Sequence, residues 1–249
     1  MAWSVKKAIV VGASSGIGEA MARRLAAQGA EVALVARRHD ELERVAAAIR
    51  STGGKAHVHV HDAAQSGEAA PLFDEIVARL GGLDCLVYAA GTMPELAEGE
   101  FDFAKDRAMI EVNLLGAIAW CGPAAQLFSA QRGGTLIGIS SIAGERGRRG
   151  NPGYCTSKAA FTTWLESARN RAARDGVNVV TIKPGFVDTA MTRGKAGLFW
   201  LISADEAARL SLQIAAKGNS ASGFVPARWA LVGFVVRWIP SFLFRRMNF

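Results

Sequence analysis

The sequence predicts an α/β fold with a single doubly wound parallel sheet of about seven strands and helices on both faces. Short apolar segments alternate with helix-forming segments along almost the whole chain, and the first of them, residues 8–11, runs directly into a glycine-rich turn and a helix. Uniformly apolar strands are typical of sheets covered on both faces. Strict alternation of strand and helix predicts parallel strands joined by right-handed crossovers.

The elements follow in order along the chain. Strands are expected at residues 8–11, 31–35, 56–60, 85–88, 135–139, 177–182 and 224–225, and helices at 19–28, 40–50, 65–80, 101–128, 152–174 and from 203 onward. Gly29 ends the first helix, Pro152 suits the first turn of the fifth, and Asp205 and Glu206 favour a helix start after Ser203. We expect one domain over residues 1–227 and a tail over 228–249 that is not a separate domain.

Composition narrows the class of protein. The net charge of +7 and the pI near 9.7 suit an anionic ligand, a membrane surface or nucleic acid. The basic residues are dispersed, without the aromatic-interleaved stripe of a nucleic-acid groove, so we expect no nucleic-acid partner. Three cysteines without a close pair argue for a reducing compartment and against disulfides or a zinc site. The N-terminus lacks the apolar core of a signal peptide, so a cytoplasmic protein is expected.

The turn after the first strand reads Gly12-Ala13-Ser14-Ser15-Gly16-Ile17-Gly18. Glycines allow a tight turn and a close approach of the backbone to a pyrophosphate, which the N-terminus of the next helix attracts. The spacing differs from the common G-x-G-x-x-G, but the turn follows a strand and opens a helix, as a dinucleotide site requires. We favour a dinucleotide site over a purely structural turn.

Two arginines, Arg37 and Arg38, follow the second strand, where an acidic residue would bind the ribose 2′-OH of NAD. Arginine offers bidentate, charge-assisted hydrogen bonds to a phosphate, so the 2′-phosphate of NADP is favoured over NAD. Both could instead be solvated loop residues, and this alternative suits Arg38 best. Asp62, after the third strand, is placed to bond an adenine amino group, or it simply begins a turn.

Tyr154 and Lys158 stand at i and i+4 of the predicted helix 152–174, so both side chains leave the same face. An ammonium one turn away is expected to stabilise the phenolate and to lower the pKa of Tyr154 toward the working range. Ser141, at the end of strand 135–139, would hold a carbonyl oxygen while Tyr154 passes it a proton. Tyr-x-x-x-Lys alone also fits an ordinary surface helix.

Together these residues resemble the short-chain dehydrogenase/reductase family, in its form of about 250 residues, from Lys7 to about Val225. Residues 12–18 look like the family's cofactor turn, and Tyr88-Ala89-Ala90-Gly91 is similar to its Asn-Asn-Ala-Gly stretch. Pro184-Gly185-Phe186-Val187-Asp188-Thr189 looks like the stretch that contacts the nicotinamide. The resemblance thus implies further cofactor-binding residues: Ala90, Gly91, Pro184, Gly185, Val187 and Thr189. Asn113, Ser141, Tyr154 and Lys158 match its catalytic set.

The resemblance implies a Rossmann-type fold and hydride transfer between a nicotinamide and a carbonyl or secondary alcohol. Tyr154 would exchange the proton, and Lys158 would bind the nicotinamide ribose hydroxyls and lower the pKa of Tyr154. Ser141 would hold the substrate oxygen, and Asn113 would anchor a water between Lys158 and solvent. Two alternatives remain: a non-catalytic NADP-binding sensor or scaffold, which would not need all four residues, and a nucleotide-sugar epimerase or dehydratase, which usually has a longer C-terminal portion.

Specificity is expected in a lid over residues 189–203. Its apolar run, residues 198–202, would close over a hydrophobic substrate or pack on the core or on a neighbouring subunit. Residues 145–149, rich in arginine, would attract an anion or form a solvated loop, with the solvated loop preferred.

The tail, residues 228–249, mixes aromatic, apolar and basic residues but falls short of the ~20 apolar residues of a spanning helix. It suits packing on the core or a partner subunit, which we favour, or an interfacial helix on a membrane. The resemblance also implies a homodimer or homotetramer formed through the helices at 101–128 and 154–174.

Overall fold

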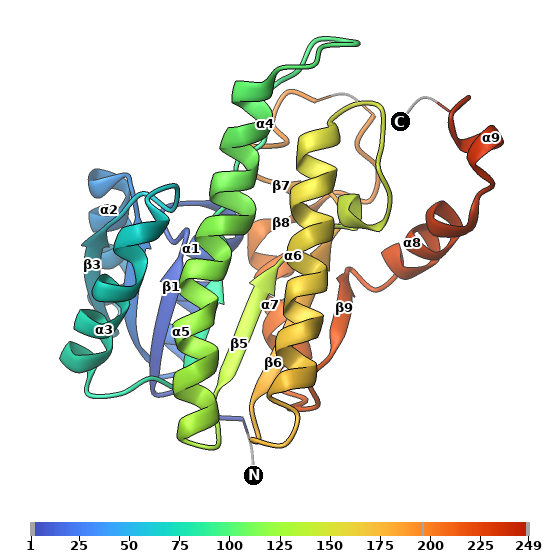
Figure 1. The fold of residues 1–249 in the computed structure, drawn as a ribbon. Coiled ribbons are helices and arrows are strands. Elements are labelled where there is room, and N and C mark those ends of the chain that lie inside the picture. The colour runs from blue at the N-terminus through green and yellow to red at the C-terminus, as the bar shows by residue number, and fades with distance from the viewer. Residues whose placement is uncertain (1–2, 196, 248–249) are drawn as a thin grey trace.

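The structure is a computed structural model that describes residues 3–195 and 197–247. Its centre is an all-parallel sheet in the order β3-β2-β1-β4-β5-β6-β9 (Figure 1). The strands are β1 (Lys7–Val11), β2 (Glu31–Ala36), β3 (Lys55–Val60), β4 (Cys85–Tyr88), β5 (Thr135–Ile139), β6 (Asn178–Pro184) and β9 (Ser222–Val225). The strand order reverses between β1 and β4, where ligands of such sheets bind. The predicted α/β fold is confirmed.

Helices connect the strands at the predicted places, and two further helices follow the last strand. They are α1 (Gly16–Ala27), α2 (His39–Ser51), α3 (Ala69–Leu80), α4 (Phe103–Ile110), α5 (Gly116–Ala130), α6 (Pro152–Arg171), α7 (Ala204–Ala215), α8 (Trp229–Trp238) and α9 (Ser241–Phe244). A π-helical turn, Glu111–Leu115, joins α4 to α5, and 3-10 turns lie at Ser66–Glu68 and Ile142–Glu145. A second sheet pairs β7 (Val187–Asp188) with β8 (Ile202–Ser203).

Two apolar layers cover the sheet because successive strand residues face opposite sides. Val10 and Leu34 pack with α1, α2 and α7 on one face, whereas Ile9 and Val35 pack with α3, α5 and α6 on the other. All four side chains are fully buried, and each contributes roughly 1.5–3 kcal/mol relative to exposure. The two layers hold the carboxyl ends of β1, β4 and β5 in fixed positions.

The continuous helical stretch Phe103–Ala130 is, by length and composition alone, apolar enough to cross a membrane. It packs on β4 and β5 and against α3 and α6, however, so we interpret it as a core helix. Helices α8 and α9 lie beyond the β9 edge of the sheet (Figure 1). The predicted domain, lid and tail include residues 1–2, 196 and 248–249, which lie outside the described residues.

Candidate active site

Helix α6 positions Tyr154 and Lys158 at the carboxyl end of β5. Its first turn is fixed by Pro152 and by Asn151, whose side-chain oxygen accepts a 2.9 Å hydrogen bond from the Tyr154 backbone N–H. The two functional side chains are buried, with 9% of Tyr154 and 4% of Lys158 exposed. The Lys158 Nζ lies 5.8 Å from the centroid of the Tyr154 ring. The structure therefore places both on one buried helix face.

Lys158 is an unusual buried cation. Its Nζ donates a 3.0 Å hydrogen bond to the Ile139 carbonyl, at the end of β5. Burial disfavours the charged form and lowers the pKa of Lys158 to about 8. The charged form of Lys158 is therefore costly to bury, and further hydrogen-bond acceptors at the Nζ would stabilise it.

Ser141 starts the 3-10 turn that follows β5. Its Oγ accepts a 3.1 Å hydrogen bond from the Ala143 N–H, which fixes the turn. Burial raises the pKa of Tyr154, and a hydrogen bond with the Ser141 hydroxyl and the charge of Arg148 oppose that rise. Lys158 does not contribute the expected lowering of the Tyr154 pKa, because desolvation prevails and the Lys158 ammonium hydrogen-bonds the Ile139 carbonyl instead.

Asn113 occupies the π-helical turn between α4 and α5. Its side chain accepts a 2.7 Å hydrogen bond from the Thr92 N–H and donates 3.0 Å bonds to the Thr92 carbonyl and the Ser157 hydroxyl. A Cβ added at Gly91 would lie 3.4 Å from Asn113 Oδ1 and 3.5 Å from Lys158 Nζ. The structure therefore brings Asn113, Gly91 and Lys158 together. π-Helical turns occur frequently at functional sites.

Tyr88 stands where the family has the first Asn of its Asn-Asn-Ala-Gly stretch. Its ring is fully buried, and its hydroxyl donates a 2.6 Å hydrogen bond to the Val112 carbonyl, one residue before Asn113. The Ala89 N–H donates to the Val11 carbonyl at 2.8 Å. A tyrosine hydroxyl thus ties the end of β4 to the π-helical turn.

The glycine-rich turn packs directly on the end of β4. Gly12 has φ +88°, and a Cβ there would lie 2.4 Å from the Ala90 nitrogen, while one at Gly18 would lie 2.2 Å from the Gly12 carbonyl oxygen. A Cβ at Gly16 (φ +59°) would approach the Thr189 side chain to 3.2 Å. Predicted cofactor residues from distant parts of the chain therefore meet here.

The N-terminus of α1 suits an anion. Ser15 occupies the N-cap position but makes no side-chain capping hydrogen bond, so it leaves the first N–H groups of the helix uncapped. Ile17 is half-buried and packs against the core cluster on that face of the sheet. Together with the backbone cradle of Gly12, Gly16 and Gly18, these features fit the pyrophosphate of a dinucleotide.

The two arginines after β2 differ in their contacts. Arg38 is an exposed loop residue, as in the solvated-loop alternative, but it also donates hydrogen bonds to the hydroxyls of Ser14 (2.8 Å) and Ser15 (2.7 Å). The Arg37 side chain is 70% exposed and lies 4.0 Å from Asp62. Asp62 also accepts a 3.0 Å hydrogen bond from the Ala64 N–H, as in the turn-forming alternative.

The stretch after β6 holds the remaining predicted cofactor residues. Pro184 ends the strand, and a Cβ at Gly185 would lie 2.0 Å from the Trp229 ring, so only a glycine lets α8 pack here. Val187 is buried in β7. The Thr189 N–H donates a 3.1 Å hydrogen bond to the Thr192 hydroxyl, which shapes the turn that follows.

The predicted lid is fastened at its base and packs on the tail. The pairing of β7 with β8 joins its two ends. Phe199 stacks on Trp229, with ring centroids 5.0 Å apart, and Trp200 contacts Trp229 edge-on at 5.7 Å. The apolar run therefore packs on the chain's own α8, although Phe199 and Trp200 keep nearly half of their surface exposed.

Sequence reasoning missed a buried ion pair and an anchor beside the site. Lys183 pairs with Glu145 at 2.6 Å, and both side chains are almost wholly buried. Arg146 donates to the carbonyls of Val236 (3.0 Å) and Ile239 and to the Ser241 hydroxyl. The preferred interpretation of residues 145–149 as a solvated loop is thus wrong for Glu145 and Arg146. The signal was Lys183 itself, a charge inside an apolar strand that needs a partner.

Apolar side chains surround the Tyr154 ring. Met109, Ala143 and Cys155 form a buried cluster with it, and the half-buried Met93 and Met191 pack against that cluster. Methionine adapts to irregular apolar ligands.

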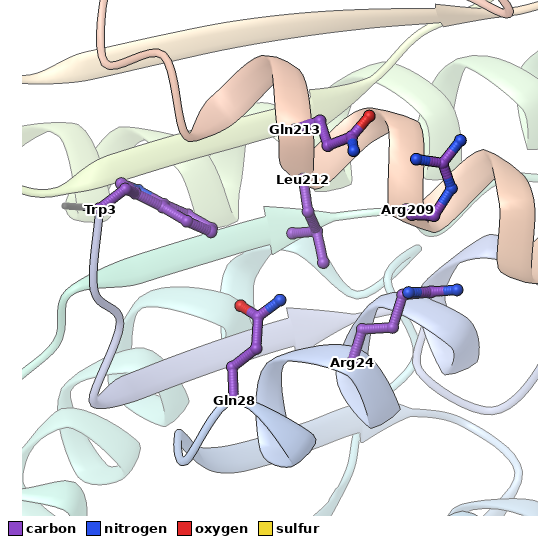
Figure 2. A pocket seen from close by; sticks show the side chains of 6 residues that line it. All are labelled: Trp3, Arg24, Gln28, Arg209, Leu212 and Gln213. Atoms are coloured by element: carbon purple, nitrogen blue, oxygen red, sulfur yellow. The ribbon is translucent and has the colours of Figure 1, made fainter.

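A separate cavity of about 190 Å³ lies between α1 and α7 (Figure 2). It is lined by Trp3, Arg24, Gln28, Arg209, Leu212 and Gln213, none of which is a predicted site residue.

Comparison with known proteins decides the family. A model of the family described as short chain dehydrogenase matches residues 6–196. The chain is a short-chain dehydrogenase/reductase. A cis-4-hydroxycyclohexanecarboxylate dehydrogenase of Sinomonas cyclohexanicum is 36% identical over 197 residues, 78% of each chain. An uncharacterised oxidoreductase of Mycobacterium tuberculosis is 31% identical over 248 residues, 97% of this chain and 96% of its own.

Solved structures agree with this assignment. A short-chain type dehydrogenase/reductase from Mycobacterium marinum superimposes with a TM-score of 0.80 at 29% identity, covering 89% of this chain and 92% of its own. The predicted family and enzyme class are confirmed: this short-chain dehydrogenase/reductase is an oxidoreductase of CH–OH groups that binds a nicotinamide cofactor.

Proposed function

We propose that this short-chain dehydrogenase/reductase uses NADP to interconvert a carbonyl and a secondary alcohol in an apolar substrate. The observation that carries the proposal is the buried Tyr154, one helical turn from the buried Lys158, whose Nζ lies 5.8 Å from the centroid of the Tyr154 ring. A phenol shielded from water between a hydroxyl and an ammonium is suited to exchange a proton with a substrate oxygen.

Each residue of the set has a defined task. The Ser141 hydroxyl holds the substrate oxygen beside Tyr154, which donates its proton in reduction and accepts it in oxidation. When bound, the nicotinamide supplies or accepts the hydride. Lys158 binds the nicotinamide ribose hydroxyls, and its charge then favours the phenolate of Tyr154. Asn113, next to Lys158 across Gly91, would anchor the water through which Lys158 exchanges protons with solvent.

Residues from five strand ends would hold the cofactor. The pyrophosphate would bind the N–H groups of residues 12–18, and Asp62 would bind the adenine amino group. Ala90 and Gly91, with the stretch from Pro184 to Thr189, would border the nicotinamide half. Arg37 supports NADP over NAD because its guanidinium is largely exposed at the end of β2, where no carboxylate stands.

The surroundings of Tyr154 support an apolar substrate. Met93, Met109 and Met191 lie around the phenol, and the predicted lid presents Phe199 and Trp200 near the tail. An apolar ring or chain would bury its surface against such side chains. One relative acts, by its name, on a hydroxycyclohexane carboxylate, so cyclic secondary alcohols belong among the first candidates.

The wider organisation is part of the same proposal. Residues 1–227 would act as one cytoplasmic oxidoreductase domain, and the protein would form a homodimer or homotetramer through α4–α5 and α6. Sedimentation or light scattering of the purified chain tests the oligomer, and a monomer at micromolar concentration would contradict it.

The proposed activity is tested with a panel of carbonyls and secondary alcohols, followed by NADPH absorbance. The panel pairs cyclic and long-chain apolar compounds with small polar ones, and each is assayed with both NADP and NAD. We expect turnover with apolar members and a higher kcat/KM with NADP. NADPH binding without turnover on any member, or a preference for NAD, would contradict the proposal.

A further inference from the structure

The C-terminal helices expose a set of large apolar side chains. On α8, Leu231, Phe234, Val235 and Trp238 stand at i, i+3, i+4 and i+7, so they share one helix face, and each is between 48% and 70% exposed. Phe242 (55% exposed) and Leu243 (45%) continue this set on α9. We call these six residues the tail patch. Monomeric proteins rarely expose apolar side chains in such continuity.

The tail patch belongs to an anchored helix. The opposite side of α8 is buried through Trp229, Gly233 and Val236, and α8 packs on β9 and on the 3-10 turn after Ser141. Arg146 fixes the far end by donating to the Val236 and Ile239 carbonyls, and its guanidinium lies 4.1 Å from the Phe244 ring centroid. These contacts therefore hold helix α8 beyond the β9 edge of the sheet (Figure 1).

The charged side chains of the tail itself are all arginines. Residues 226–249 include Arg228, Arg237, Arg245 and Arg246 and contain no Asp or Glu. The carboxylate paired with Arg237, Glu145, lies 4.0 Å away and already pairs with Lys183 at 2.6 Å. The apolar side chains are thus accompanied by arginines whose charge the tail itself does not neutralise.

This charge pattern distinguishes between two possible partners of the tail patch, a second copy of the chain and an anionic bilayer. A two-fold contact between copies would bring the same patch against itself and place eight tail arginines together without a tail carboxylate. An anionic bilayer would instead pair the arginines with lipid phosphates and accept the Trp, Phe and Leu side chains at the acyl boundary. We propose that the tail patch docks this protein on the surface of an anionic membrane.

The geometry fits an interfacial position. The ten residues of α8 are too few to span a bilayer, which takes about 20, so the helix would lie in the membrane plane. Arg228 contacts the Trp200 ring at 5.1 Å, and Trp229 stacks on Phe199. The docking surface therefore adjoins the predicted lid.

Vesicle flotation tests the proposal with the full chain, without cofactor or substrate, so the result is independent of the proposed activity. We expect flotation with phosphatidylcholine vesicles that contain phosphatidylglycerol, no flotation with phosphatidylcholine alone, and weaker binding at high salt. Two variants, Leu231→Ser/Phe234→Ser/Trp238→Ser and Arg245→Gln/Arg246→Gln, should each lower partitioning by about tenfold or more. The replaced side chains are exposed, so circular dichroism and melting should match the parent.

Matched control variants distinguish vesicle binding through the tail patch from non-specific binding by other exposed apolar or basic side chains. Val60→Ser removes an exposed apolar side chain at the opposite sheet edge, and Arg171→Gln/Arg174→Gln removes two exposed charges at the far end of α6 and just beyond it. Both should float like the parent. Failure of the parent to bind anionic vesicles, or parent-like flotation of the triple variant, would overturn the proposal. Conversion of a dimer to a monomer by the triple variant, without vesicle binding by the parent, would instead assign the patch to a second copy.

Discussion

The Arg38 guanidinium donates a 2.8 Å hydrogen bond to the Ser14 hydroxyl and thereby ties the loop after β2 to the glycine-rich turn. The same nitrogen bonds Ser15 at 2.7 Å, so two hydroxyls at the start of α1 are held by one cation. Arg37, its neighbour, has a side chain that is 70% exposed and lies 4.0 Å from Asp62. We infer that the two arginines have different roles: Arg38 stabilises the glycine-rich turn, and Arg37 binds the 2′-phosphate of NADP.

Arg37→Ala should change the choice of cofactor. A charge-assisted hydrogen bond to phosphate contributes about 1.5–3 kcal/mol, so the KM for NADP should rise by about tenfold or more, with little change for NAD. Steady-state kinetics with both cofactors measures this. Arg79→Ala, an exposed arginine on α3, is the control. An unchanged cofactor preference would refute the assignment of Arg37.

Arg148→Gln should shift the pH profile of alcohol oxidation. The charge of Arg148 lowers the pKa of Tyr154, and oxidation requires the deprotonated phenol. Loss of the charge should therefore move the rise in kcat/KM for the alcohol to higher pH, with the KM for NADP unchanged. Arg149→Gln, one residue further along, should leave the profile in place. A shift with Arg149→Gln alone would show that the named charge is wrong.

Lys158→Met should stabilise the cofactor-free protein in a pH-dependent way. The pKa of Lys158 is lowered from 10.5 to about 8, so at pH 7 the folded state holds a cation that the unfolded state solvates better. This cost is about 3 kcal/mol below pH 8 and disappears as the pH rises toward 10.5, where the amine is neutral in both states. Urea unfolding at pH 7 and pH 10 compares the two proteins. A gain at pH 7 no larger than at pH 10 would contradict the account.

Much of the fold was predictable because local patterns and burial agree. Apolar runs such as residues 85–88 are strands, and the glycine-rich turn precedes α1 as expected. The predicted helix at 101–128 contains a π-helical turn at Asn113, which no helical period shows, because one inserted residue leaves the apolar pattern on either side intact. The short pairing of β7 with β8 is likewise too brief to leave a periodic signal.

The residues of the candidate site could be predicted from the sequence, but the pKa shifts of those residues could not. Tyr154 and Lys158 follow from their spacing, yet the balance of burial against charge depends on atoms contributed by other elements. The contacts of Arg38 and Arg146 are not predictable from local sequence because their partners are distant: Ser14 for the first, and carbonyls about 90 residues away for the second. The residues that flank a loop arginine do not indicate a hydrogen-bond partner that lies far away in the sequence.

The central claim is that the Tyr154 phenol transfers the proton, and Tyr154→Phe tests it most directly. The substitution removes one hydroxyl and keeps the ring that packs against Met109 and Ala143. We expect kcat to fall by about 10²–10⁴-fold or more while NADPH binding, measured by fluorescence titration, stays close to that of the parent. Turnover equal to the parent's, with intact NADPH binding, would contradict the account.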